Sequence, residues 1–590
     1  MNEFYKFFDF TLNPATRRLL IQNEEVAVSS KAFDILSYLV ENRGKIVSKD
    51  ELFQMIWADS FVEENNLPVH ISALRRVLGD KRGESRFIKT ISGRGYSFIA
   101  PVEKSKTPSA ALPKNDGSNL VNNSPDKQNS IAVLPFAFEN ENADLEYLAG
   151  GITQSLIESL SQIPNLKVMA YTAVKNYRKS NLDLSEVGFQ LSVDKILLGT
   201  LTEHKNRLDL SVELINTADR SHLWGTQYNC QVTDVFAVKK EISLVIADKL
   251  KLQISRIDES NLSQSQTNNA EAYQFYLKGK YILDNFQSGE DYQESLYSAL
   301  NFFQQALKRD SNYAPAYVGS GRVYFMLFND NFLSLAEARQ KCQTALQLAF
   351  DADRHLSDTF ALQGMIQIYF ERNWQEAKKS LAHAVRLNPN DSYAFHALSL
   401  LLACLGNFDE AIFYQNQALQ FDPTSLILNS GLINRFFLAE NFRQAIVQAE
   451  EALELNPRSV TALALMALSF ANLKVFDEAI NVIDKVIAAQ SLKELLLIKA
   501  HIYALAKKEN AARETLKSVL TDSDNGRQVD FTDAAAVYSA LNDQDKTFEF
   551  LEKAFLKGST NLLCLKVDPR FNKSRGDSRF DALLQKLNLE

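Results

Sequence analysis

The spacing of apolar residues changes along the chain, and each change predicts a different kind of structure. Residues 1–28 hold short alternating runs such as Phe10-Thr11-Leu12, which predict strands. Between residues 30 and 78 apolar residues recur every three or four positions in three blocks, which predicts three helices. From residue 270 onward helical spacing continues to the end of the chain, which predicts a long all-helical region.

Capping and helix-stop residues mark the ends of the first three helices. Gly44 and Gly79 are predicted helix stops, and Ser48 with Glu51 three residues later is a capping box that starts the second helix. After the third helix, residues 87–91 and 96–99 read as two strands joined by a glycine-containing turn, which predicts a hairpin. Short strands, three helices and a terminal hairpin predict an α+β winged helix over residues 1–103.

Charge changes this picture only locally. The net charge of the chain is -8, so a nucleic-acid site would have to be a confined basic patch. Such a patch runs from the third helix into the hairpin, where only Asp80 and Glu84 oppose a set of basic residues. These are Arg75, Arg76, Lys81, Arg82, Arg86, Lys89 and Arg94.

The motifs AFDILSYLVENRGKIVSKDELFQMIW, VHISALRRVLGD and IKTISGRGYSFIAPV resemble the OmpR/PhoB-type DNA-binding domain. The resemblance covers residues 4–102 and implies that the third helix enters the major groove while the hairpin wing approaches the minor groove. It implies double-stranded DNA as a partner. The residues that it implies face DNA are Asn65, Asn66, His70 and Arg75 on the helix, Thr90, Ser92 and Arg94 on the wing, and Arg76 as a phosphate contact.

Taken alone, His70 and the Arg75-Arg76 pair would be ordinary solvated helix residues. Their place between a capped helix and a glycine-flanked wing favours nucleic acid instead. Ser72 and Ala73 occupy positions where relatives often carry arginine, so we predict DNA binding without an operator sequence.

Residues 104–129 are rich in Ser, Pro, Asn, Asp and Lys and are expected to form a flexible linker. Such a linker cannot carry a rigid lever motion. Control would then act by docking, by dimerisation, or by raised effective concentration at paired sites. Dimerisation or partner-driven assembly is favoured, because related winged helices bind as pairs.

Residues 130–255 alternate strands and helices and predict an α/β domain. IAVLPF, YLAGGITQSLIESLSQI and VELINTADRSHLWGTQY resemble the TolB-N-terminal-like/FlgO-like domain, which supplies no chemistry. Gly150-Gly151 lacks the spacing of a phosphate loop and is predicted to be a turn at the start of a helix.

The helical region repeats every 34 residues. Pro389, Pro423 and Pro457 keep this interval, as do Ala377, Ala411, Ala445 and Ala479. An aromatic, two small residues and a terminal proline at this period resemble the tetratricopeptide (TPR) repeat. Residues 270–590 are therefore expected to be an all-α TPR solenoid with a C-terminal cap, whose groove takes a protein or peptide partner.

The four cysteines (Cys230, Cys342, Cys404 and Cys564) lie far apart, so neither a metal site nor a disulfide framework is expected. No nucleophile–base spacing, phosphate loop or cofactor motif is present, so no catalytic or cofactor residues are predicted. With no signal peptide and no long apolar run, the sequence predicts a cytoplasmic protein without membrane contact.

The sequence thus predicts a multidomain transcriptional regulator, not an enzyme, that binds DNA, with a homodimer on DNA as one option. The alternative is a TPR scaffold in which the winged helix contacts protein.

Overall fold

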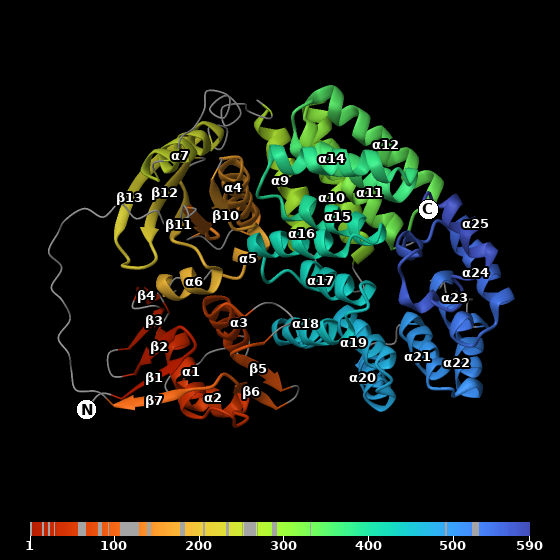
Figure 1. Ribbon diagram of the computed structural model, residues 1–590. Helices are drawn as coiled ribbons and strands as arrows, with labels where there is room; N and C mark the ends of the chain where they lie inside the picture. The colour runs from red at the N-terminus through yellow and green to blue at the C-terminus, as the bar shows by residue number, and fades with distance from the viewer. Residues whose placement is uncertain are drawn as a thin grey trace.

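The computed structural model describes most of the chain, with gaps. The described residues are 3–14, 17–21, 24–26, 28, 30–56, 66–80, 85–91, 94–106, 129–138, 143–163, 165–177, 183–204, 207–231, 235–250, 252, 267, 269–285, 292–330, 332–489, 493–521 and 530–589. Figure 1 shows three parts: a head at the red end, a middle unit in yellow, and a helical solenoid from green to blue.

The head, residues 3–106, has the expected strands, three helices and hairpin. Gly44 and Gly79 both adopt positive φ just after a helix, as their predicted role as stops requires. The elements are β1 Glu3–Phe7, β2 Phe10–Asn13, β3 Arg18–Ile21, β4 Glu24–Val26, α1 Ser30–Glu41, α2 Lys49–Ile56, α3 Asn66–Leu78, β5 Ile88–Ile91, β6 Gly95–Phe98 and β7 Glu103–Lys106.

The last strand of the head extends past its expected end at residue 103. Strand β7 pairs antiparallel with β1, so the sheet has the order β4-β3-β2-β1-β7, while β5 and β6 form a separate hairpin. The expected linker between residues 107 and 128 lies outside the described residues.

The middle unit is the expected α/β domain. Its sheet has the order β10-β8-β11-β12-β13, with β9 beside β11, and the strand pattern of alternating burial in residues 207–216 matches the alternation read from the sequence. Its elements are β8 Asn129–Val133, β9 Ala137–Phe138, α4 Ala143–Ser161, β10 Leu166–Val168, α5 Tyr171–Val174, α6 Leu184–Leu191, β11 Lys195–His204, β12 Arg207–Asn216, β13 His222–Gln231 and α7 Val235–Lys249.

The prediction for Gly150-Gly151 is wrong. Both glycines lie inside α4, and a Cβ on Gly151 would meet the side chain of Leu277 at 2.6 Å. Their small size lets α4 approach the first solenoid helix, so the middle unit and the start of the solenoid share one apolar core.

The solenoid consists of paired helices, and the repeat residues act as predicted. Ala377, Ala411, Ala445 and Ala479 are fully buried between helices. The helices are α9 Ala270–Asn285, α10 Tyr292–Arg309, α11 Ala314–Asn329, α12 Leu335–Ala352, α13 Ser357–Ile366 with the π-helical turn η2 Gln367–Glu371, α14 Trp374–Leu387, α15 Ser392–Cys404, α16 Phe408–Phe421, α17 Leu426–Leu438, α18 Phe442–Leu455, α19 Val460–Asn472, α20 Phe476–Ala489, α21 Lys493–Leu505, α22 Glu509–Thr521, α23 Phe531–Ala540 and α24 Gln544–Lys557.

The C-terminal cap returns to the middle of the solenoid. It comprises the short 3-10 turns η3 Thr560–Cys564 and η4 Pro569–Phe571 and helix α25 Ser578–Lys586. Cys404 at the end of α15 forms a disulfide with Cys564 in η3, which corrects the expectation that no disulfide would form. Cys230 and Cys342 are free and buried.

Candidate DNA-recognition surface

Helix α3 and the wing are held together by their own domain. Leu67, Ile71 and Leu74 of α3 are fully buried in the head core. At the wing, Gly95 has φ +137°, and a Cβ there would meet the carbonyl oxygen of Val47 at 2.0 Å. Only glycine fits where β6 crosses the backbone before α2, so the wing is placed firmly beside α3.

Arg75 joins α3 to the wing. Its Nε and Nη2 donate to the carbonyl oxygen of Ile88 at 3.1 Å each, and Nη2 also donates to Thr90 Oγ1 at 2.6 Å. Two of the predicted DNA residues, one on the helix and one on the wing, are therefore brought together. The same bonds give Arg75 a structural role in the head that the sequence did not suggest.

The outer side of this pair faces the solenoid. Arg75 Nη1 lies 3.6 Å from Glu454 Oε2 and 3.7 Å from Glu451 Oε1, both on α18, and Thr90 donates a hydrogen bond to Glu454. Burial lowers the pKa of Arg75, but Glu454 and Glu451, with smaller contributions from Tyr96 and Asp80, raise it above its ordinary value. Burial raises the pKa of Glu454 above its ordinary value, and Arg75 and Thr90 partly offset this rise.

His70 and Arg76 face the middle unit instead. His70 Nδ1 lies 2.8 Å from Glu186 Oε1 of α6, and the residue is only 2% exposed. Arg76 donates a hydrogen bond to Ser192 Oγ, just after α6. Burial, together with the nearby charge of Arg76, lowers the pKa of Lys167 to about 8.

The other predicted residues are less informative. Arg94 at the wing tip is exposed. Asn66 begins α3, but its side chain is not described, and Asn65 and Ser92 lie outside the described residues.

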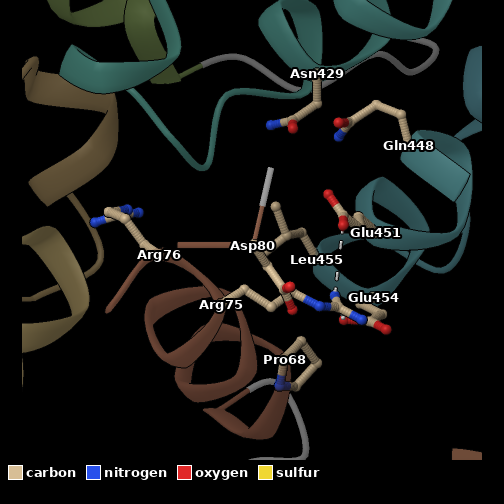
Figure 2. Close-up of a pocket in the computed structure, with 9 residues that line it drawn as sticks. All are labelled: Pro68, Arg75, Arg76, Asp80, Asn429, Gln448, Glu451, Glu454 and Leu455. Atoms are coloured by element: carbon tan, nitrogen blue, oxygen red, sulfur yellow. Dashed lines mark ion pairs between the residues drawn. The ribbon is translucent and has the colours of Figure 1, made fainter. Parts of the chain in front are cut away.

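The contact with the solenoid is incompletely packed. A cavity of about 120 Å³ lies between α3 and helices α17 and α18, and Figure 2 shows the residues that line it. A second cavity, of about 180 Å³, lies nearby between the wing and α18. The first is lined by Pro68, Arg75, Arg76 and Asp80 from the head and by Asn429, Gln448, Glu451, Glu454 and Leu455 from the solenoid.

Sequence reasoning missed the acidic residues of this surface. Glu186, Glu451 and Glu454 lie far from the head in sequence, and glutamates are common on exposed helix faces. A usable signal would have been Glu450-Glu451 and Glu454 together, since they concentrate negative charge on one helix of a chain with a local basic patch.

Comparison with known proteins assigns each part to a type. Residues 23–98 match the family model "Transcriptional regulatory protein, C terminal". Residues 127–245 match "HilA/YgeH-like transcriptional regulator, second domain", and residues 392–425 match "Tetratricopeptide repeat". The head is an OmpR/PhoB-type winged helix. It is followed by a HilA-like regulator domain and by TPR repeats. The middle-unit match is thus to this second domain, whereas the sequence pointed to a TolB-N-terminal/FlgO-like one.

Similar curated proteins support the same assignment. The chain is 24% identical to "Transcriptional regulator HilA" of Salmonella typhi over 528 residues, covering 88% of this chain and 89% of that protein. "Putative adenylate cyclase 3" of Rhizobium meliloti is 28% identical over 27% of each chain. "Transcriptional regulatory protein YvrH" of Bacillus subtilis is 31% identical over 103 residues, which are 17% of this chain and 44% of that protein.

Two further features are absent from the described part of the chain. There, no three His, Cys, Asp or Glu side chains come together in a way that could hold a metal ion. Nor is any described helix both long and apolar enough to cross a membrane.

Proposed function

We propose that this protein is a sequence-specific DNA-binding transcriptional regulator whose solenoid binds a protein or peptide partner. The observation that carries the proposal is the OmpR/PhoB-type winged helix, joined to a HilA-like domain in a chain similar to HilA over most of its length. Regulators and TPR proteins of these kinds act by binding, and the proposal includes no catalytic step.

The proposed DNA contacts are those that the resemblance implies. Arg94 at the exposed wing tip would approach the minor groove or backbone, and α3 would enter the major groove with Asn66, His70 and Arg75, while Arg76 would contact a phosphate. Thr90, hydrogen-bonded to Arg75 where helix and wing join, would lie near the backbone or minor groove. Asn65 and Ser92 complete the proposed set.

Selection of genomic DNA fragments tests this function. The full-length protein and its Glu454→Lys variant would each be immobilised and offered fragmented genomic DNA. The substitution lies in solenoid helix α18, outside the DNA-binding head. We expect recovered fragments to share a motif, and binding to fall steeply with salt because phosphate contacts release counterions. If neither protein enriches any sequence and DNA retention ignores salt, the head contacts protein and the chain is a scaffold.

The solenoid supports the partner-binding half of the proposal. Its helix pairs repeat with the TPR interval, and TPR arrays present a concave surface suited to extended or helical segments. A partner bound there should slow amide hydrogen exchange in the odd-numbered helices from α13 to α21. Unchanged exchange in all of them would remove this half of the proposal.

A further inference from the structure

We propose that an acidic surface made by α18 and α6 docks the DNA-recognition face of the head and competes with DNA for it. The acidic surface is defined as Glu450, Glu451 and Glu454 of α18 with Glu186 of α6. The inference rests on the proposed function, since it concerns how DNA binding by the head is controlled. Figure 1 shows α3 lying between α6 and α18, and both helices contact it.

The contacts engage the side chains that DNA would need. Of the proposed DNA residues with described side chains, His70, Arg75, Arg76 and Thr90 all contact the middle unit or the solenoid. Arg76 is exposed despite its hydrogen bond, and Arg94 at the wing tip is exposed as well. Glutamate oxygens accept from groups that would otherwise donate to phosphate oxygens, so one side chain cannot satisfy both partners at once.

The 34-residue repeat shows that docking, not the repeat fold, buries Glu454. The equivalent residues in the two preceding repeats are Gln420 and Arg386, and both are exposed. Glu454 has only 5% of its side chain exposed, beneath Arg75 and Thr90 of the head. Arg386 also shows that the repeat accepts a basic residue at this position.

The docked head is held in a way that permits release. Its apolar core is separate from the cores of the middle unit and solenoid, and within the described residues Phe189 of α6 is the outside side chain packed against it. The cavities between α3, the wing and α18 leave part of the interface unfilled. Opposite charges carry the remaining contact, and such contacts weaken with salt.

The docked state must lower the apparent affinity for DNA. If only a fraction of molecules has an undocked head, the measured dissociation constant rises by the inverse of that fraction. Replacing Glu454 with lysine puts a cation against Arg75 and should open the interface. The docked state then no longer competes with DNA binding.

The test measures DNA binding by full-length variants. Wild type, Glu454→Lys and the double variant Gln417→Lys/Gln420→Lys would be titrated onto a labelled random-sequence duplex of about 30 base pairs, which reports phosphate binding without a known operator. The double variant adds the same two units of positive charge at the positions of the preceding repeat that are equivalent to Glu451 and Glu454, where Gln420 is exposed. Glu186→Gln opens the α6 side as a second, independent variant.

We expect Glu454→Lys to bind the duplex about tenfold more tightly than wild type or more, and Glu186→Gln to tighten binding less. The double control should stay near wild type. Equal affinity of wild type and Glu454→Lys, or an equal gain in the control, would overturn docking while leaving the proposed function intact. If no variant binds DNA, the proposed function itself is lost and docking as its control goes with it.

Amide hydrogen exchange gives a readout that does not depend on DNA. In Glu454→Lys, the described parts of α3, α6 and α18 should exchange faster, while α15 and α23 keep their protection. If α3 exchanges as slowly in folded Glu454→Lys protein as it does in wild type, the head stays docked and the proposal is overturned.

Discussion

The head and the C-terminal cap both pack onto the middle of the solenoid, but different interactions hold them there. The head meets α18 through carboxylates, cavities and a core of its own. The C-terminal cap instead shares one continuous apolar core with α13–α19, and Trp374 Nε1 donates to the carbonyl oxygen of Leu587 at 3.1 Å. Shared apolar burial makes a permanent joint, whereas a charged, partly empty contact suits a joint that opens.

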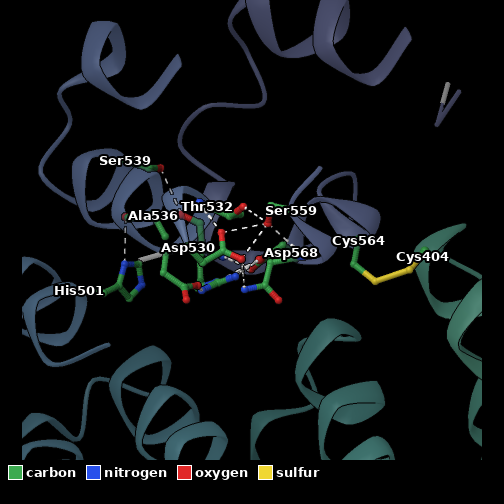
Figure 3. A network of polar contacts seen from close by, with 12 residues as sticks. Cys404, His501, Asp530, Thr532, Ala536, Ser539, Ser559, Cys564 and Asp568 are labelled. Atoms are coloured by element: carbon green, nitrogen blue, oxygen red, sulfur yellow. Dashed lines mark hydrogen bonds and ion pairs between the residues drawn. A yellow bond between two sulfur atoms is a disulfide. The ribbon is translucent and has the colours of Figure 1, made fainter. Parts of the chain in front are cut away.

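The polar groups of the cap also form a permanent contact. Figure 3 shows a network in which Asp530, Thr532 and Ser559 bond one another near Asp568, with the Cys404–Cys564 disulfide close by. Arg570 donates to Asp533 at 2.6 Å and to Asp568 at 2.7 Å. These charges are enclosed and mutually satisfied, so the network fixes the cap in one arrangement.

The largest effect should come from breaking this network. Arg570→Ala leaves Asp533 and Asp568 buried without their cation, and should cost about 3–5 kcal/mol of cap stability. The measurement is the free energy of opening of cap helix α25, and of α23, which carries Asp533, by amide exchange. Arg579→Ala is the matched control, because Arg579 also pairs with two aspartates but is exposed, and it should change little. Equal losses in both variants would show that the cap does not depend on its buried ions.

Removing the disulfide should have the next largest effect. Cys404→Ser/Cys564→Ser frees a loop of 160 residues and should lower cap stability by about 2–4 kcal/mol in the same exchange measurement. Wild type with reductant should behave like the double variant. DNA affinity should not change, since the contacts of the described part of the head are with α6 and α18. A gain in DNA affinity like that expected for Glu454→Lys would mean that attachment of the cap and docking of the head are coupled.

The elements of the fold could be predicted because their signals are local. Ser48 Oγ accepts from the backbone amide of Glu51 at 3.1 Å, as the capping box predicted, and Pro389 follows the end of α14 as a helix stop should. A cap, a glycine or a proline acts within a few residues of itself, so sequence alone reveals it. The winged helix, the α/β unit and the solenoid followed from such signals.

The contacts between units could not be predicted in this way. Glu454 occupies the repeat position that Arg386 and Gln420 expose to solvent, and nothing next to it in sequence marks it as covered. Cys404 and Cys564 are 160 residues apart, and their pairing depends on how many repeats separate them in space. Docking was one of three control routes considered from the linker, and sequence alone favoured another.

The wing tip can separate DNA binding from docking. Arg94 is exposed in the docked protein and takes no part in the contacts with α6 or α18 described above. Arg94→Ala should therefore weaken binding to all sequences alike and lower the salt slope by about one unit, as expected for the loss of one phosphate contact. The measurement is duplex affinity over a salt series, in the Glu454→Lys background so that docking does not interfere. An unchanged slope would place Arg94 away from DNA.

The smallest expected effect concerns pH and tests whether the acidic surface controls docking. Burial and the neighbouring Glu454 raise the pKa of Glu450 to about 7, although Lys89 and Arg75 of the head oppose this. Docking therefore takes up a proton at Glu450. Its contribution is fully present below the ordinary pKa of glutamate and is lost as pH rises through about 7.

Wild type should consequently bind the duplex a few-fold more tightly at about pH 8 than at about pH 6, because ionised Glu450 disfavours the docked state. Glu450→Gln cannot ionise and should lose this part of the pH dependence. Both proteins keep the same head and differ only at position 450, so the difference between their pH profiles isolates Glu450. If the two pH profiles coincide, the ionisation of Glu450 does not affect docking, and the ionic contact rests on Glu451, Glu454 and Glu186.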